Sequence, residues 1–262
     1  MGSDKIHHHH HHMIRIKTPS EIEKMKKAGK AVAVALREVR KVIVPGKTAW
    51  DVETLVLEIF KKLRVKPAFK GYGGYKYATC VSVNEEVVHG LPLKEKVFKE
   101  GDIVSVDVGA VYQGLYGDAA VTYIVGETDE RGKELVRVTR EVLEKAIKMI
   151  KPGIRLGDVS HCIQETVESV GFNVIRDYVG HGVGRELHED PQIPNYGTPG
   201  TGVVLRKGMT LAIEPMVSEG DWRVVVKEDG WTAVTVDGSR CAHFEHTILI
   251  TENGAEILTK EG

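Results

Sequence analysis

The alternation of apolar and polar positions is clearest between residues 101 and 125. Valine occupies every second position from Val104 to Val108, and Asp107 lies on the opposite face, which predicts a half-buried strand. A second apolar run, Ala119 to Val125, predicts the partner strand. If the hairpin turns at Tyr112-Gln113, Asp107 lies directly opposite Asp118. Two carboxylates about 5 Å apart repel, so the pair predicts a cation between them, unless the register differs and both carboxylates are exposed.

The rest of the pattern combines helices and strands and predicts an α+β fold. Pro19-Ser20 precedes an apolar-periodic run, and Glu23 completes a capping box with Ser20 as the N-cap. Helices with a 3.6-residue period are predicted at about 20–42, 51–63, 132–150 and 158–170. Further strands are predicted at 78–83, 209–215 and 244–250, and a loop at 85–92.

The sequence contains an internal repeat with a constant offset. Three pairs of segments are each 107 residues apart: Pro45-Gly46 and Pro152-Gly153, Asp51-Val52 and Asp158-Val159, and Lys99-Glu100-Gly101 and Arg206-Lys207-Gly208. The same offset carries Asp107 onto Glu214. Repeats of this kind predict two copies of one structural unit. We therefore expect one domain, residues 13–262, whose pseudo-symmetric halves cover about 13–126 and 127–262 and bring Asp107 close to Glu214.

The amino-acid composition limits the class of protein to which this chain can belong. The chain has 262 residues, and residues 1–12 are interpreted as an expression tag that holds six of the twelve histidines. The net charge of -1 gives no electrostatic argument for binding nucleic acid or membranes. Three cysteines without paired spacing (Cys80, Cys162 and Cys241) favour a reducing compartment. With no signal peptide and no apolar run long enough to span a bilayer, we expect a cytoplasmic protein.

Two more stretches carry candidate chemistry. Glycines surround His181 in Gly180-His181-Gly182, so that the backbone can approach a neighbour closely; the alternative is a glycine-rich turn with an incidental histidine. Glu245 lies in an apolar strand, where the alternative is an edge-strand glutamate. Together with Asp107 and Asp118 of the hairpin and the repeat-related Glu214, they form a set of four carboxylates and one imidazole, which suits two hard or borderline divalent ions. The set is Asp107, Asp118, His181, Glu214 and Glu245.

The order and spacing of these residues resemble the methionine aminopeptidases of metallopeptidase family M24, which have the pita-bread fold. The resemblance extends from about Met13 to Leu258 and is closest to the short type 1 form. The matching motifs are Asp107-Val108-Gly109, Gly117-Asp118, Gly180-His181-Gly182-Val183-Gly184, Glu214-Pro215 and Glu245-His246-Thr247. The resemblance implies two divalent metal ions per chain, which could be cobalt, manganese, iron or zinc. Asp107 would chelate one ion, Asp118 and Glu245 would bridge both, and His181 and Glu214 would complete the second.

The resemblance also implies catalytic roles. The two ions would hold a water or hydroxide that attacks the peptide bond, and Glu214 would accept its proton. His188 would stabilise the tetrahedral intermediate, and His89 would hydrogen-bond the scissile peptide. For both histidines the alternative is a loop histidine bonded to the backbone. His246 is expected on the opposite strand face from Glu245, outside the ligand set.

An apolar pocket for the methionine side chain is implied as well. Its residues would be Tyr72, Tyr75, Cys80, Leu187 and Trp231. Cys80 could equally be a buried small hydrophobe, and Trp231 a core residue. Leu187 stands where the family commonly has an aromatic residue, which leaves the width of the pocket open.

The implied activity is removal of the initiator methionine from nascent polypeptides whose second residue is small. The expected partners are these polypeptides and, transiently, the ribosome, with the enzyme a monomer that binds neither nucleic acid nor membrane. An X-Pro peptidase would share the ligands, but the chain lacks the N-terminal domain of those relatives. A non-catalytic binding protein on the same fold has little support, because all five ligands and both accessory histidines are present.

Overall fold

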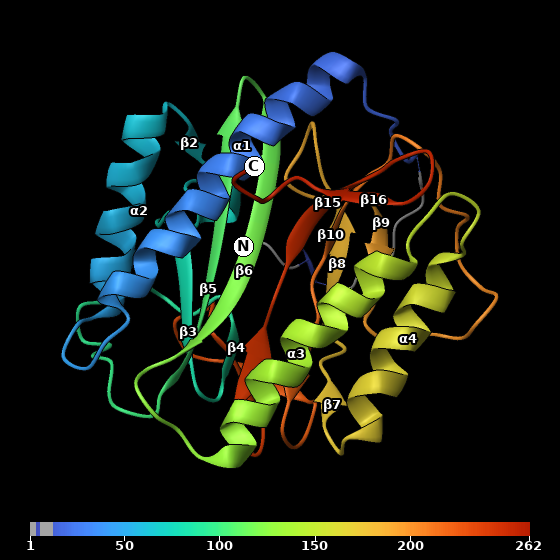
Figure 1. Ribbon diagram of the computed structural model, residues 1–262. Helices are drawn as coiled ribbons and strands as arrows, with labels where there is room; N and C mark the ends of the chain where they lie inside the picture. The colour runs from blue at the N-terminus through green and yellow to red at the C-terminus, as the bar shows by residue number, and fades with distance from the viewer. Residues whose placement is uncertain (1–3, 6–12) are drawn as a thin grey trace.

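The computed structural model describes residues 4–5 and 13–262, and its helices cover antiparallel sheets (Figure 1). The helices are α1 (Pro19–Glu38), η1 (Val39–Val42), α2 (Ala49–Leu63), η2 (Tyr72–Gly74), α3 (Glu130–Met149) and α4 (Leu156–Ser169). The strands of residues 1–126 are β1 (Asp4–Lys5), β2 (Lys66–Pro67), β3 (Thr79–Val83), β4 (Glu86–Val88), β5 (Ile103–Tyr112) and β6 (Leu115–Ile124). Those that follow are β7 (Asn173–Val174), β8 (Tyr178–Gly182), β9 (Glu189–Ile193), β10 (Thr210–Ile213), β11 (Met216–Ser218), β12 (Val224–Val226), β13 (Ala233–Thr235), β14 (Cys241–His243), β15 (His246–Ile250) and β16 (Ala255–Ile257). The predicted α+β class is confirmed.

The N-cap of the first helix is Thr18, two residues before the predicted one. Thr18 Oγ1 accepts a hydrogen bond from Glu21 N at 3.2 Å, and Glu21 Oε1 accepts one from Thr18 N at 2.9 Å. The capping box is therefore Thr18 with Glu21, and the prediction of Ser20 with Glu23 is wrong. Pro19 explains the difference, because proline is favoured in the first helical turn, where its missing N–H is not needed.

The central hairpin has a different register from the predicted one. Asp107 pairs with Ala120 and Gly109 pairs with Asp118, so the two carboxylates are diagonal neighbours rather than direct partners. The turn is Gln113-Gly114, with φ of 47° and 80°, the positive values that a two-residue hairpin turn of type I′ requires. Both carboxylates still lie on one face of the sheet, since residues two apart on a strand share a face.

Three other local predictions were also wrong. The predicted loop 85–92 contains β4, which pairs with β13. Of the predicted strand 244–250, only His246–Ile250 forms a regular strand, β15, and Glu245, in the break between β14 and β15, pairs with Ala120 of β6. Glu214 follows β10 instead of lying inside it, because that strand ends at Ile213. Both glutamates therefore lie where regular strand pairing stops.

The two sheets that carry most of the site belong to different parts of the chain. The first pairs β2, β5 and β3, with β6 on β5, and the second has the order β1-β8-β10-β15-β16, with β9 on β8. In Figure 1 α1 crosses in front of the first sheet with α2 at its left, and α3 and α4 lie beside each other on the side of the second sheet. Each half of the chain thus supplies two helices and an antiparallel sheet.

Backbone geometry repeats with the offset found in the sequence. Gly46 and Gly153 have φ of 91° and 94°, and Gly101 and Gly208 have φ of 89° and 90°. Two isolated bridges, Thr48 with Val97 and Arg155 with Val204, occupy equivalent places. These matches support the proposed halves 13–126 and 127–262 within one domain.

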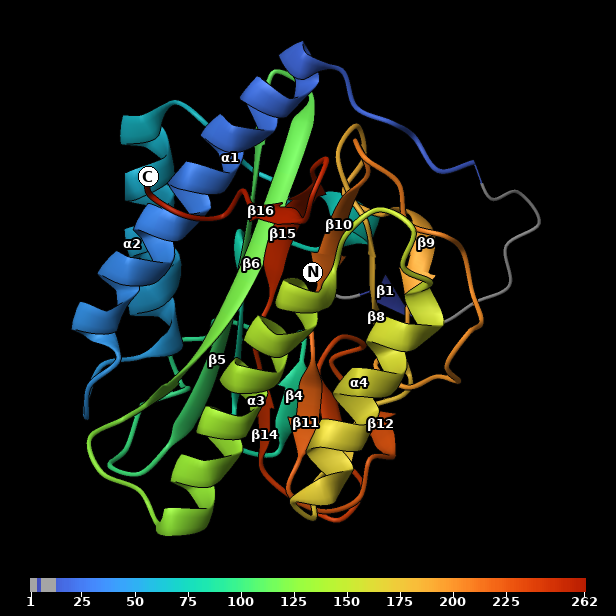
Figure 2. The same ribbon diagram turned by 45° about the vertical axis from the view of Figure 1, so that its right-hand side comes forward.

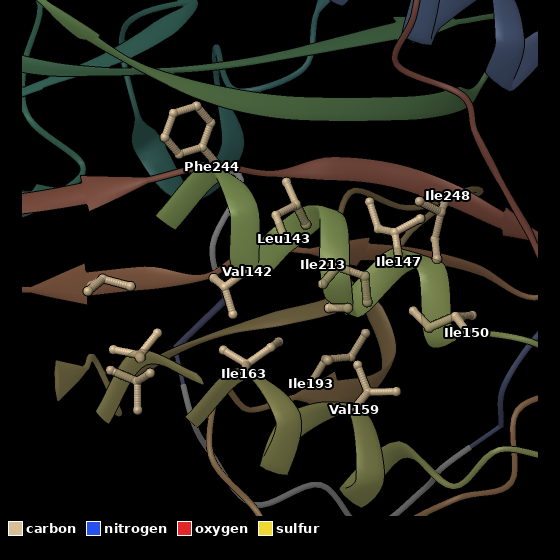
Figure 3. Packing of buried hydrophobic residues seen from close by; sticks show 14 of the residues in the cluster. Val142, Leu143, Ile147, Ile150, Val159, Ile163, Ile193, Ile213, Phe244 and Ile248 are labelled. Carbon is tan, nitrogen blue, oxygen red and sulfur yellow. The ribbon is translucent and has the colours of Figure 1, made fainter. Parts of the chain in front are cut away.

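The largest hydrophobic cluster fixes α3 and α4 against the second sheet. Figure 3 shows Val142, Leu143 and Ile147 of α3 packed near Ile213 and Ile248, which belong to β10 and β15. A second cluster packs α1 and α2 against β5 and β6. The strands that carry the acidic residues are thus fixed from the helical side by apolar packing.

Most of the predicted tag lies outside the described part of the chain. Of the predicted tag, residues 1–12, only Asp4–Lys5 is described, and this short strand pairs with β8 (Figure 2); the other ten residues lie outside the described part, and the tag assignment stays a prediction. Among the described helices, none is long and apolar enough to cross a membrane.

Candidate metal centre

The five predicted ligands converge from both halves of the chain. Asp107 and Asp118 come from β5 and β6, His181 from β8, Glu214 from the end of β10, and Glu245 from the break between β14 and β15. All five are buried, and the last four have no exposed surface. The repeat-based expectation that Asp107 and Glu214 belong to one site agrees with this convergence.

His181 lies within 4 Å of three of the four carboxylates. His181 Nε2 lies 3.1 Å from Glu214 Oε2, 3.6 Å from Asp118 Oδ2 and 3.8 Å from Glu245 Oε2. Among the described residues, two groups of three have ligand atoms within 4.8 Å of one another: Asp107, His243 and Glu245, and Asp118, His181 and Glu245. Glu245 belongs to both groups, as a bridging carboxylate would.

The donor set fits divalent metal. No N–H or O–H of the described residues donates to either oxygen of Glu245, although both oxygens are buried. A buried carboxylate without a partner is costly. Four buried carboxylates near one imidazole would be stabilised by two divalent cations, and carboxylate and imidazole groups are suitable ligands for them.

The pKa values show how strongly the acids interact without metal. Burial, together with the charges of Glu214 and Asp107, outweighs the opposing effect of His181 and raises the pKa of Asp118 to about 7. Burial and the charges of Asp118 and Glu214 raise the pKa of Glu245 well above its usual value. Without a cation, therefore, the cluster retains protons on some of its carboxyl groups near neutral pH.

His181 and Glu214 behave as an ion pair in the metal-free cluster. Burial opposes the charge on His181, but Asp118 and Glu214 outweigh it and raise its pKa to about 10. Burial likewise opposes the charge on Glu214, and hydrogen bonds from His181 and His243 outweigh it and lower its pKa. Metal would have to displace the proton of His181.

The backbone around His181 sets its orientation. His181 Nδ1 donates to the carbonyl of Gly182 at 2.9 Å, which leaves Nε2 to face the acids. A Cβ atom at Gly180 would lie 2.4 Å from the carbonyl oxygen of Ala212, and one at Gly182 would lie 2.1 Å from that of Asp190. The glycines are thus required by close packing against β10 and β9, as the sequence suggested.

The two accessory histidines have different neighbours. The ring centroid of His188 is 4.3 Å from that of His181, and His188 Nδ1 is 2.7 Å from the Tyr72 hydroxyl. His89 contacts the ring of Tyr178, the first residue of β8, with centroids 5.3 Å apart. Its φ of 60° is uncommon for a residue other than glycine, as found at many functional sites.

Four of the five predicted pocket residues form one apolar cluster. Tyr75, Cys80 and Leu187 are buried together, and Trp231 packs edge-on against Tyr75 with centroids 5.0 Å apart. Cys80 pairs with Asp107 across β3 and β5, so the cluster adjoins the acids. Tyr72 does not belong to this cluster: it is 41% exposed and bonds His188.

Sequence reasoning missed two residues here. Phe69 is fully buried in the apolar cluster, and a Cβ atom at Gly109 would lie 2.5 Å from its ring. His243 is 1% exposed, and its Nε2 lies 3.1 Å from Glu214 Oε1. A period of two counted back from Glu245 would have placed His243 on the same side. His246 instead bonds Thr259 at 2.7 Å, away from the acids.

Comparisons with known proteins agree with this geometry. The chain matches the profile of metallopeptidase family M24 over residues 23–252. Methionine aminopeptidase 1 of Bacillus subtilis is 51% identical over 248 residues, which cover 95% of this chain and 100% of that protein. The crystal structure of methionine aminopeptidase from Rickettsia prowazekii is similar with a TM-score of 0.92 and 40% identity, over 94% of this chain and 100% of that one.

A prolidase is also similar, at lower identity. The structure from Pyrococcus horikoshii matches 94% of this chain with a TM-score of 0.77 and 29% identity, and the match covers 64% of the prolidase. The predicted pita-bread fold, which these proteins share, is confirmed. With the family profile and relatives of such identity matched along nearly its whole length, the chain belongs to metallopeptidase family M24, among the methionine aminopeptidases.

Proposed function

We propose that this metallopeptidase removes the initiator methionine from nascent polypeptides whose second residue is small. The observation that carries the proposal is the buried group of four carboxylates and His181 beside an apolar cluster containing Tyr75, Cys80 and Leu187. Its methionine aminopeptidase relatives match it at 43% to 51% identity.

Two divalent ions are proposed for the site. Asp107, Asp118 and Glu245 would hold one, and Asp118, His181, Glu214 and Glu245 the other, with Asp118 and Glu245 shared. The membership of Glu245 in two ligand groups supports the pair. When bound, such ions activate a water molecule and polarise the substrate carbonyl at neutral pH. Cobalt, manganese, iron and zinc all fit this donor set.

Glu214 is proposed as the proton acceptor for the attacking water. It is buried beside the other acids, and hydrogen bonds from His181 and His243 keep its carboxylate charged despite burial. Its Oε2 contacts His181, while Oε1 contacts His243. A charged, oriented carboxylate can take a proton from a neighbouring water within hydrogen-bond distance.

His188 and His89 are proposed to act on the substrate. Tyr72 bonds His188 Nδ1, so we assign Nε2 to donate to the oxygen that becomes negatively charged as the peptide bond is attacked. His89 lies beside Tyr178 of β8 and would hydrogen-bond the scissile peptide. Neither side chain is assigned a metal-binding role.

The apolar cluster would bind the first side chain of the substrate. Tyr75, Leu187, Trp231 and the sulfur of Cys80 offer aliphatic and aromatic surface, which suits an unbranched thioether. We assign Tyr72 to the rim, where it holds His188. We further propose that the enzyme works in the cytoplasm as a monomer and meets its substrates at the ribosome.

A panel of peptides varied at the first two positions tests the assignment. Met-Gly, Met-Ala and Met-Ser peptides should be cleaved well, and Met-Leu or Met-Lys poorly. An N-acetyl-Met peptide should resist cleavage, because the free amine must reach the site. Norleucine should replace methionine, since one altered group in an apolar pocket changes specificity by only about 1–3 kcal/mol.

The similarity to a prolidase makes an X-Pro peptidase the second candidate. Efficient cleavage of a Gly-Pro peptide with Met-Ala left intact would overturn the methionine assignment and leave the metallopeptidase. Metal-stripped protein, reconstituted anaerobically with each ion in turn, should bind two ions per chain. Binding of one ion at saturation would contradict the dinuclear centre.

A further inference from the structure

His243 is a buried histidine in the metal centre that the proposed mechanism uses only indirectly. It is the last residue of β14 and 1% exposed, and its Nε2 lies 3.1 Å from Glu214 Oε1. A carboxylate oxygen accepts hydrogen bonds and cannot donate them. The proton of this contact therefore lies on His243 Nε2, which donates to Glu214.

The backbone of His243 is held from two sides. It pairs with Met216 across β14 and β11, two residues beyond Glu214. On the other side, His243 N donates to Thr122 Oγ1 and Thr122 Oγ1 donates to His243 O, each at 2.8 Å. Ser105 Oγ lies 2.8 Å from the same hydroxyl. The imidazole is thus fixed relative to the segment that carries Glu214.

We propose that His243 is a positioning residue, which holds Glu214 Oε1 so that Oε2 faces His181 and the reaction site. The proposal rests on the role of Glu214 proposed above. The two contacts to Glu214 come from opposite ends of its carboxylate: His243 at Oε1 and His181 at Oε2, each at 3.1 Å. Fixing both oxygens limits the carboxylate to one orientation before substrate arrives.

Direct metal binding by His243 is the competing role. Its ligand atoms lie within 4.8 Å of those of Asp107 and Glu245. Metal binding through Nε2 would require that atom to release its proton and give up Glu214. The short contact to Glu214 favours the donor role, since a donating nitrogen has no lone pair for a metal.

The test compares His243→Ala with His243→Gln, because a glutamine amide can donate from nearly the position of histidine Nε2. His243→Ala should lower kcat about 10- to 100-fold with little change in KM, and weaken binding of one of two Mn²⁺ ions by a similar factor, as loss of a partner behind a ligand typically does. His243→Gln should remain within about 3-fold of the parent in both measurements, since it keeps the hydrogen bond. Titration calorimetry measures the number and affinity of the bound Mn²⁺ ions independently of activity.

His246→Gln is the matched control, because that neighbouring ring bonds Thr259 instead of an acid. It should leave both measurements unchanged, and circular dichroism should show native secondary structure in every variant. Complete loss of one ion in both His243 variants would make His243 a ligand and overturn the proposal. A parent-like His243→Ala would overturn it as well.

Glu214→Gln separates this inference from the function on which it rests. An active Glu214→Gln variant would refute the assigned role of Glu214 itself. An inactive Glu214→Gln together with a parent-like His243→Ala would refute only the positioning role. Rescue by glutamine but not by alanine is the result that the proposal requires.

Discussion

Replacing Asp118 by asparagine should make the metal-free protein more stable while it weakens metal binding. Asp118 is fully buried near Asp107, Glu214 and Glu245, and without a cation its charge is opposed by burial and by two of those acids. Asparagine has nearly the same shape and removes the charge. The backbone contacts of Asp118 to Thr247, at 3.0 and 2.7 Å, do not depend on its side chain.

The expected magnitude follows from the pKa of Asp118, which rises from 3.8 to about 7 in the folded protein. At about 1.36 kcal/mol for each pKa unit, the charged form costs the folded state on the order of 4 kcal/mol. Because the folded state holds the proton to higher pH than the unfolded state, the cost is absent below pH 3.8, grows as pH rises, and is complete above about 7. The increase in the free energy of unfolding caused by Asp118→Asn should therefore be largest near pH 8 and vanish near pH 4.

Urea unfolding in the presence of a chelator measures this gain at several pH values. With Mn²⁺ in excess the order should reverse, because ions that bind only the folded parent stabilise it by mass action. Glu58→Gln on α2, where the side chain is 63% exposed, is the control and should change little at any pH. A metal-free Asp118→Asn that is less stable than the parent near pH 8, or a gain independent of pH, would refute the reasoning.

Three further predictions concern residues outside the proposed ligand set. His188→Ala should lower kcat about 100- to 1000-fold, as loss of one oxyanion donor does, and retain full metal content; metal lost in proportion to activity would make His188 a ligand. Hydrogen bonding by Arg185 lowers the pKa of Glu21 to about 2, so its stabilising contribution should be present above about 4.5 and be lost as pH falls towards 2. Thermal unfolding of Glu21→Gln should then differ from the parent near neutral pH and converge with it in acid, and a constant difference would argue against this pair. Leu187→Ala should cost about 2–5 kcal/mol in unfolding free energy and raise KM for Met-Ala peptides, and an unchanged KM would place Leu187 outside the pocket.

Asp107 and Asp118 lie on one face of the sheet, as predicted, although the predicted hairpin register was wrong. The turn was placed at Tyr112-Gln113 and lies at Gln113-Gly114, one residue further. Moving a hairpin turn by one residue shifts the pairing by two, which keeps every side chain on its original face. The glycine at 114 was the available signal, because the second turn residue requires positive φ.

The misplaced helix start has an equally local cause. Thr18 with Glu21 and Ser20 with Glu23 both fit the capping-box pattern, and only Pro19 distinguishes them. By contrast, the roles of Phe69 and His243 depend on partners brought close by the folded chain. Phe69 packs against Gly109 on β5, and His243 bonds Glu214. A period of two puts His243 on the side of Glu245, but no short motif encodes its contact with Glu214 or that of Phe69 with Gly109.

The backbone of Glu245 forms hydrogen bonds that join the two proposed halves of the chain. Glu245 N donates to the Ala120 carbonyl at 2.9 Å, and Ala120 N donates to the Glu245 carbonyl at 3.2 Å. Beside this seam, Thr247 bonds Asp118, a residue 129 positions away. The contact between the proposed halves therefore runs through the proposed metal centre, and neither half alone contains all five proposed ligands. An ion shared by Asp118 and Glu245 would cross-link residues far apart in the sequence. Removing it with a chelator should therefore weaken the association of the two halves as well as abolish peptide hydrolysis.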